Sequence, residues 1–116
     1  MSAETITPPV APTPAPPGSL TIDLTRTGAR ADLHLCGRLG QQGSQQIDDL
    51  IDCLVLAGAG QVAVDVDGLS TVDAAVLAFL RGRQRRCAAL GLAFTVTSTR
   101  ARTRRLVDMV GLRAEP

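Results

Sequence analysis

The chain has 116 residues, an apolar content of 45% and a formal net charge of +1 at pH 7. This length favours one folded domain, because a single hydrophobic core serves roughly 100–200 residues. The apolar stretches fall short of the ~18 residues needed to cross a bilayer, so no direct membrane insertion is expected. The three cysteines form no CxxC pair and accompany a single histidine. That pattern favours reduced thiols in the cytoplasm over a metal site or a disulfide framework.

The N-terminal segment is rich in proline, with six of the seven prolines between Pro8 and Pro17. It has neither the basic start nor the apolar core of a secretory signal. Proline cannot donate a backbone hydrogen bond, and the segment has little apolar surface to bury. We therefore expect a disordered Pro-rich tail over residues 1–18 and a folded domain over residues 19–116. A solubilising extension is favoured over a ligand for a proline-binding module.

The first elements of the domain read as a hairpin. LTIDLTRTG (20–28) and ARADLHLCGRL (29–39) alternate apolar and polar residues around a short turn at Gly28. This pattern predicts two antiparallel strands at a sheet edge. It places His34 on the solvent face, and Cys36, at the end of the apolar alternation, is interpreted as a small core residue.

Helices and strands then alternate. SQQIDDLIDCLVLAG (44–58) carries one apolar stripe and predicts a helix that stops at Gly58 or Gly60, and residues 61–66 predict a buried strand. A helix from about Ala74 to Leu90 follows, with Asp73 as its N-cap. Val76, Leu77 and Cys87 are expected on its inner side, and Arg81 and Arg85 on its outward side. A second buried strand (92–97) and a helix (99–110) complete the domain. The buried strand that follows the first helix implies a parallel crossover. The sum predicts an α/β fold, a mixed sheet of four or five strands with helices packed on it.

Charge is distributed unevenly along this domain. Residues 39–80 contain six aspartates and no basic residue, whereas residues 81–105 contain eight arginines and no acid. The aspartates of the first helix are interpreted as a solvated face. The uneven distribution itself favours a partner that is oriented by charge.

Residues 65–112 resemble the STAS domain, the fold of bacterial anti-sigma-factor antagonists. The family's signature is roughly D-L-x-x-[LV]-x-x-[IVM]-D-S-S-G-L, then a helix, a glycine, a strand and a closing [KR]-R-L-x-D-x-x-G-L. The matching residues are Asp65, Leu69, Val72, Asp73, Leu77, Gly91, Arg104, Arg105, Leu106, Asp108, Gly111 and Leu112. GRLG at 37–40 stands where the family usually has G-x-L-D. The resemblance covers about residues 19–116 and implies a STAS-like mixed sheet.

The departures from the signature fall at the site where members of the family are phosphorylated. Its phosphorylated serine lies in the S-S pair, and both of those positions are alanine here, Ala74 and Ala75. The next glycine is Val76, and the aspartate after G-x-L is Gly40. In the family an anti-sigma kinase phosphorylates the serine, and the modified antagonist then releases the kinase. Alanine has no hydroxyl, so the resemblance implies an antagonist that this reaction cannot switch off.

The same resemblance implies where a partner binds. In the family the partner covers the N-terminus of the helix after the aspartate and the loop after the second strand. The corresponding surface is Leu39, Gly40, Gln41, Ser70, Thr71, Asp73, Ala74, Ala75, Val76 and Leu77. The expected partner is an anti-sigma factor, either kinase-like or degenerate, and no cofactor is expected. Ser70 and Thr71 are the nearest hydroxyls, and a turn or cap role is favoured over a displaced phosphosite.

Other functions fit the sequence less well. No Ser-His-Asp or Cys-His spacing, phosphate-binding loop or metal cluster is recognisable, so an enzyme is not expected. The arginine-rich half raises nucleic acid as a partner, but the two aromatic residues lie on apolar faces and offer no stacking platform. A monomer is favoured, with a dimer left open. The alternative function is a STAS adaptor subunit of a bacterial lipid-transporting ABC complex, a group that also lacks the serine pair.

Overall fold

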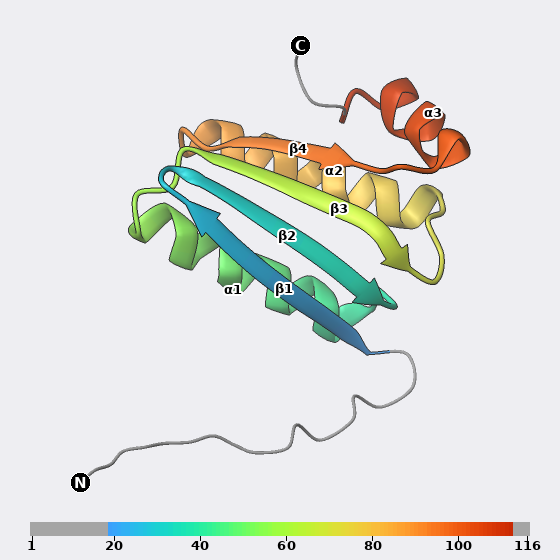
Figure 1. Cartoon of the computed structure of the whole chain (residues 1–116), viewed down its shortest axis with the longest axis horizontal. Coiled ribbons are helices and arrows are strands. Elements are labelled where there is room, and N and C mark those ends of the chain that lie inside the picture. The colour runs from blue at the N-terminus through green and yellow to red at the C-terminus, as the bar shows by residue number, and fades with distance from the viewer. Residues whose placement is uncertain (1–18, 113–116) are drawn as a thin grey trace, which may run out of the picture.

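A four-stranded mixed sheet and three helices form the domain in the computed structural model, which describes residues 19–112 (Figure 1). In chain order the elements are β1 (Leu20–Thr27), β2 (Arg30–Gly37), α1 (Gln41–Leu56), β3 (Gln61–Leu69), α2 (Ala74–Ala89), β4 (Ala93–Thr97) and α3 (Ala101–Met109). The expected α/β fold is confirmed, with four strands. The predicted Pro-rich tail (1–18) and the last residues (113–116) lie outside the described residues.

The strands stand in the sheet in chain order. β1 pairs antiparallel with β2, and the hairpin between them turns at Gly28, whose φ is 61°. β2 and β3 pair in parallel, as do β3 and β4, so α1 and α2 each serve as a crossover. Both predictions, the edge hairpin and the parallel crossover, are confirmed.

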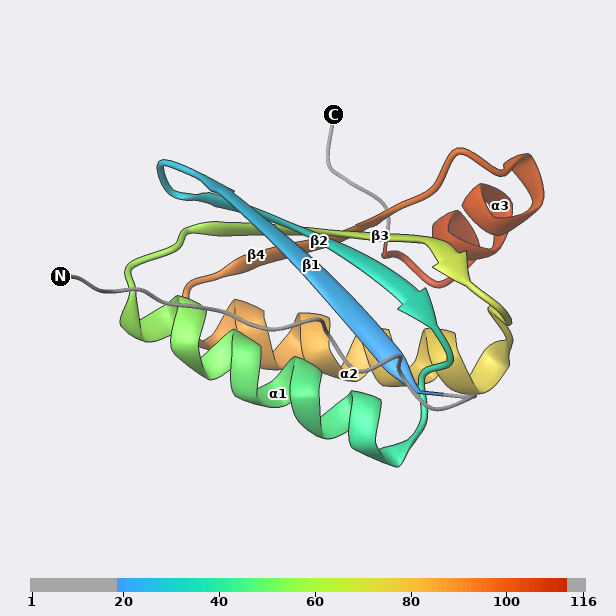
Figure 2. The ribbon, with the colours of Figure 1, turned by 60° about the horizontal axis from the view of Figure 1, so that its bottom comes forward.

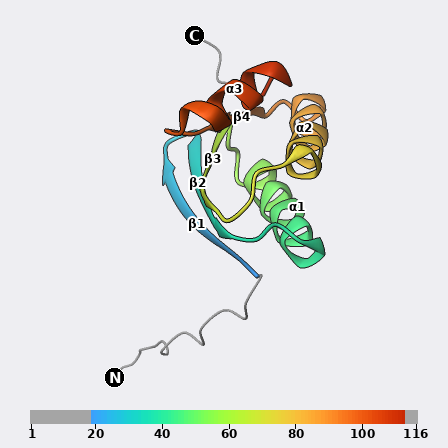
Figure 3. The ribbon, with the colours of Figure 1, turned by 90° about the vertical axis from the view of Figure 1, so that its right-hand side faces the viewer.

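The two long helices cover one face of the sheet. Seen end-on in Figure 3, α1 and α2 lie side by side on the same side of the curved strands. They run in the same direction, so both begin at one end of the sheet and both end at the other (Figure 2). α3 lies at the C-terminal ends of β3 and β4, away from the α1–α2 layer. The arrangement places the two crossover loops that precede α1 and α2 at a common end.

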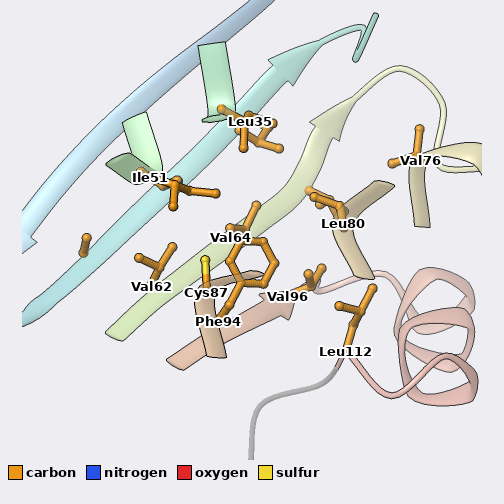
Figure 4. Packing of buried hydrophobic residues seen from close by; sticks show 14 of the residues in the cluster. Leu35, Ile51, Val62, Val64, Val76, Leu80, Cys87, Phe94, Val96 and Leu112 are labelled. Carbon is orange, nitrogen blue, oxygen red and sulfur yellow. The ribbon is translucent and has the colours of Figure 1, made fainter. Parts of the chain in front are cut away.

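The core fills the space between the sheet and the α1–α2 layer (Figure 4). Leu33 and Leu35 of β2, Ile51 of α1 and Leu80 of α2 are each at most 1% exposed. Burying a side chain of this size stabilises a fold by about 1.5–3 kcal/mol. Cys87 also lies in this core, as predicted, and burial raises the pKa of its thiol to about 11, so that it stays protonated at neutral pH.

The interpretation of Cys36 as a core residue is wrong, because its side chain is exposed. On β2 the residues Ala31, Leu33 and Leu35 face the helices, so the alternation of a strand turns Cys36 to the opposite face. His34 shares that face, as predicted, and its Nδ1 lies 3.0 Å from a carboxylate oxygen of Asp65 on β3.

The start of α1 was predicted three residues too late. The helix begins at Gln41, with Gly40 as its N-cap. Gly43 is buried because it lies one turn before Ile47 on the same stripe, and a β-carbon there would come within 3.0 Å of the Leu20 side chain. A glycine contributes nothing to an apolar pattern, which is why the periodicity became visible only at Ile47.

Ion pairs join the outer surfaces of α1 and α2. Asp48 accepts a hydrogen bond of 2.6 Å from Arg83, and Asp52 accepts one of the same length from Arg86. The Arg83 guanidinium also lies 4.9 Å from the centre of the Phe79 ring. The interpretation of these aspartates as a merely solvated face is therefore wrong for Asp48 and Asp52. Part of the uneven charge along the sequence is therefore neutralised by ion pairs between α1 and α2 of the same chain.

The β4–α3 segment is attached by polar contacts. The carboxylate of Asp67 on β3 accepts hydrogen bonds from the backbone N–H of Thr99 (2.8 Å) and from the hydroxyls of Ser98 and Thr99. Arg81 donates to the carbonyl of Val110, and the backbone N–H of Val96 donates to Leu112. Arg81, expected on the outward side of α2, is thus partly buried against the end of α3.

Asp67→Asn is expected to lower the free energy of unfolding by about 1 kcal/mol at neutral pH, because the ionised carboxylate is the acceptor. Desolvation raises the pKa of Asp67, but the hydrogen bonds from Ser98 and Thr99 and the charge of Arg100 outweigh it and leave the pKa below its usual value. Because the pKa of Asp67 is lower in the folded than in the unfolded protein, its carboxylate stabilises the fold at pH values above the unfolded-state pKa of about 4. This stabilisation is lost as the pH falls through the folded-state pKa. Urea unfolding of both proteins between neutral and acidic pH measures the difference.

The matched control for this prediction is Asp49→Asn, at an exposed position on α1 whose carboxylate accepts only a long hydrogen bond of 3.4 Å from Gln45. It should change stability little at any pH. A difference between wild type and Asp67→Asn that does not shrink in acid would show that the charge of Asp67 is not what holds the β4–α3 segment.

Candidate partner-docking site

Two loops meet at the end of the sheet where α1 and α2 begin. One follows β2 and the other follows β3, and because these strands are parallel neighbours their carboxyl ends lie at the same edge. The backbone N–H of Ser70 donates to the carbonyl of Gly37 at 2.7 Å, and the Ser70 hydroxyl donates to the same oxygen at 3.1 Å. The two loops are therefore held together by direct hydrogen bonds.

Glycines allow this close approach. Gly37 has a φ of 100°, a region that favours glycine, and a β-carbon there would overlap the carbonyl oxygen of Ser19. The register of β2 against β3 shifts between His34 and Cys36. Just after this shift, a β-carbon on Gly68 would lie 2.5 Å from the Leu35 carbonyl oxygen. Both positions fix how the loops leave the sheet.

Asp73 caps α2, as predicted. Its backbone is extended, and its carboxylate accepts a hydrogen bond of 3.0 Å from the backbone N–H of Val76. An N-cap of this kind contributes roughly 1 kcal/mol to helix stability. By contrast α1 begins at Gly40, which offers no side chain to cap its first turn. The carboxylate of Asp73 is thus already engaged with its own helix.

The structure brings most of the sequence-predicted site residues to one exposed surface. Gly40, Gln41, Ser70, Thr71, Asp73, Ala74 and Ala75 are exposed and Leu39 is half-buried. Val76 and Leu77 are 8% and 5% exposed and belong to the core beneath them. These two residues can support the surface from below, but they offer little area to a partner.

A pocket of about 410 Å³ lies between the two loops and the starts of the helices. It is lined by Arg38, Leu39, Ser44, Thr71, Asp73, Ala75, Val76 and Phe79. Arg38, Ser44 and Phe79 were missed in the sequence. Ser44 is four residues after Gly40 and Phe79 four after Ala75, so helical spacing alone would have placed both beside the predicted loops.

The chemistry of the site is that of a contact surface. Ala74 and Ala75 present only methyl groups at the start of α2, and the Ser44 hydroxyl donates to the Gly40 carbonyl of its own helix at 2.9 Å. Among residues 19–112, no three His, Cys, Asp or Glu side chains are grouped as they would be to hold a metal ion. Within the same residues, no helix has the length and apolar character that a bilayer crossing requires.

The fold and this loop pair define a STAS domain. Residues 22–114 match the family model described as "Mlab, STAS domain", which covers most of the chain. The protein therefore belongs to the STAS domain family, and the resemblance noted in the sequence is confirmed. A comparison with curated proteins found no match.

Two solved structures are similar. One is an anti-sigma factor antagonist from Mycobacterium paratuberculosis, with a TM-score of 0.62, 17% sequence identity, and coverage of 84% of this chain and 83% of that one. The other is the anti-sigma factor antagonist SpoIIAA in its unphosphorylated form, with a TM-score of 0.59, 20% identity, and coverage of 81% and 82%. At these identities the likeness establishes a shared fold.

Proposed function

We propose that this protein is an anti-sigma-factor antagonist, a protein–protein interaction module that binds an anti-sigma factor and is not released by serine phosphorylation. The observation that carries the proposal is the exposed start of α2, where Ala74 and Ala75 stand on a surface shared with the loop after β2. This surface holds small side chains and one pocket, so the backbone of a partner can approach closely. The similar folds of two antagonists support the same function.

The partner is an anti-sigma factor, either kinase-like or degenerate, and the site of action is the cytoplasm. The docking surface consists of the predicted site residues that are not buried, with Arg38 and Phe79 added by the pocket. These predicted residues are Leu39, Gly40, Gln41, Ser70, Thr71, Asp73, Ala74 and Ala75. Because Asp73 is engaged as a cap, Arg38 is the charged group of the pocket that remains for recognition.

A second function has its own support. An adaptor subunit of a bacterial lipid-transporting ABC complex would also lack the serine pair, and the matching family model is named for Mlab rather than for an antagonist. Affinity purification of the tagged full chain from its own bacterium, followed by mass spectrometry, separates the two. Recovery of an anti-sigma factor supports the first function. Recovery of a transporter ATPase instead of an anti-sigma factor would contradict the first function and support the second.

A kinase-like partner with ATP should leave the intact mass of this protein unchanged, because positions 74 and 75 have no hydroxyl. The neighbouring Ser70 hydroxyl is already bonded to Gly37. The double variant Ala74→Ser/Ala75→Ser restores both acceptors and is the matched control, expected to gain a phosphate, which carries about −1.5 to −2 charges. A phosphate mapped to Ser70 or Thr71 of the wild type would mean that the switch has moved rather than vanished.

A further inference from the structure

The outward side of α3 is a second exposed surface, and it is rich in arginine. The helix packs on the domain through Thr103 and Val107, which are buried. Asp108 is the only acid in residues 100–109, so four arginines against one aspartate give this segment a net charge of +3. All four arginines are exposed, and we call them the α3 cationic face: Arg100, which is the N-cap of the helix, Arg102, Arg104 and Arg105.

The positive charge of this face is not neutralised as it is on α2. Arg83 and Arg86 of α2 pair with aspartates of α1. The arginines within α3, by contrast, make no ion pair and no side-chain hydrogen bond with any residue of the described range 19–112. The part of the uneven charge that is not neutralised between α1 and α2 is therefore concentrated on one short helix.

The α3 cationic face lies at the same end of the molecule as the docking surface. α3 follows the carboxyl end of β4, and the docking loops follow the carboxyl ends of its parallel neighbours β2 and β3 (Figure 1 and Figure 2). Asp67, near the end of β3, accepts a hydrogen bond of 2.8 Å from the backbone N–H of Thr99, the residue before Arg100. This contact fixes the start of α3 beside the β3–α2 loop. A partner seated on the docking loops therefore comes close to the α3 cationic face.

Three classes of anionic partner can meet such a face, namely nucleic acid, a lipid surface and an acidic protein. Phe79 packs against the core and Phe94 is 4% exposed, so neither of the chain's two aromatic rings offers a platform for bases. A helix that lies on a membrane inserts an apolar face. Leu106 and Val107 instead pack against the domain, and Met109 is the one large apolar side chain that α3 exposes.

An acidic protein surface fits the face better than the other two classes. Guanidinium groups bind carboxylates through paired hydrogen bonds, and they are more weakly hydrated than ammonium groups. The face also continues a surface of small side chains that suits a protein partner, and Ala75 lies on that surface.

We infer that the α3 cationic face binds an acidic patch of the anti-sigma factor that occupies the docking surface, an inference that rests on the proposed function. The four arginines then lie at the rim of the interface, whereas Ala75 and the pocket lie within it. Charges at a rim steer the encounter of two proteins and raise the association rate. The face therefore speeds binding of a partner with an acidic patch and disfavours a partner whose patch is basic.

Association kinetics of the anti-sigma factor recovered by affinity purification test the inference. Arg102→Gln/Arg105→Gln should lower the association rate constant about three- to tenfold at about 0.05 M salt and change the dissociation rate little. The difference should disappear near ~0.5 M salt, where charges are screened over a few ångströms. The fold should be retained, because both side chains are exposed and glutamine is a good helix former.

Arg30→Gln/Arg85→Gln is the matched control, because it removes the same two charges elsewhere. Arg30 begins β2 at the opposite end of the sheet, and Arg85 is exposed in the second half of α2. This variant should associate as the wild type does. Equal slowing by both double variants would assign the effect to the net charge of the chain and overturn the inference.

Two other results separate the inference from the proposed function. An unchanged association rate for Arg102→Gln/Arg105→Gln, in a protein whose binding is weakened by Ala75→Glu, would overturn the inference and leave the proposed function intact. A wild type that binds no anti-sigma factor would overturn both.

Titration of the full chain with duplex DNA and with phosphatidylglycerol vesicles covers the other two classes of anion. At about 0.15 M salt neither should bind the wild type more tightly than it binds Arg102→Gln/Arg105→Gln. Binding to either one that depends on these two arginines, together with an unchanged association rate for the anti-sigma factor, would assign the α3 cationic face to that anion and contradict an acidic protein partner.

Discussion

Gly37→Ala is expected to lower the free energy of unfolding by at least about 3 kcal/mol. The φ of 100° at this position costs a residue with a β-carbon about 1–3 kcal/mol. The added methyl group would also overlap the Ser19 carbonyl oxygen, which is backbone and cannot rotate away. Chemical denaturation of the full chain measures the loss, and a small domain has only about 5–15 kcal/mol to lose.

Gly28→Ala separates the two causes. Its φ of 61° is also positive, but nothing lies within 4 Å of the β-carbon that the substitution adds. We expect a loss of about 1 kcal/mol, from the backbone conformation alone. Equal losses for the two variants would show that the close approach of the β2–α1 loop to Ser19 is not a constraint, and that the docking loops are free to rearrange.

The layout of the fold could be predicted because it follows from local patterns. Alternation in residues 20–37 defines the hairpin, and the stripe from Ile47 to Leu54 defines the inner face of α1. Gly91, with a φ of 80°, follows the end of α2 as expected of a glycine stop. Asp73 has the residue type and the position of a cap, and its hydrogen bond to Val76 confirms that role.

What was missed depends on contacts between distant segments. Arg81 meets the end of α3 across 29 residues of chain. Such contacts leave no local pattern in a sequence. The error at Cys36 had a different cause, because the alternation that places Leu33 and Leu35 in the core already places Cys36 on the face of His34.

The candidate site was predictable in outline from the resemblance to the STAS family. Helical spacing already placed Val76 and Leu77 on the inner side of α2, whereas the resemblance placed both on the partner surface. The structure confirms the inner position, because both side chains are buried. Arg38 was missed because nothing in the sequence shows that its side chain lines a pocket with α2.

Ala75→Glu is expected to weaken binding of the anti-sigma factor by about 1–3 kcal/mol, or roughly 5- to 150-fold. Ala75 is exposed and lines the docking pocket, so a partner would bury the new carboxylate. The fold should be unaffected, because an acid in the first turn of a helix is favourable. Arg38 lines the same pocket and can offset part of this cost. The uncharged Ala75→Gln is therefore included, and it should weaken binding less than Ala75→Glu.

Isothermal titration calorimetry of the purified partner into wild type, Ala75→Glu and Arg85→Ala tests the docking surface most directly. Arg85 is exposed on α2 outside the docking pocket, so Arg85→Ala should bind as the wild type does. Of the two variants, only Ala75→Glu should have a larger dissociation constant than the wild type. Unchanged affinity for Ala75→Glu together with lost affinity for Arg85→Ala would place the partner on the basic side of α2 and contradict docking at the β2–α1 and β3–α2 loops.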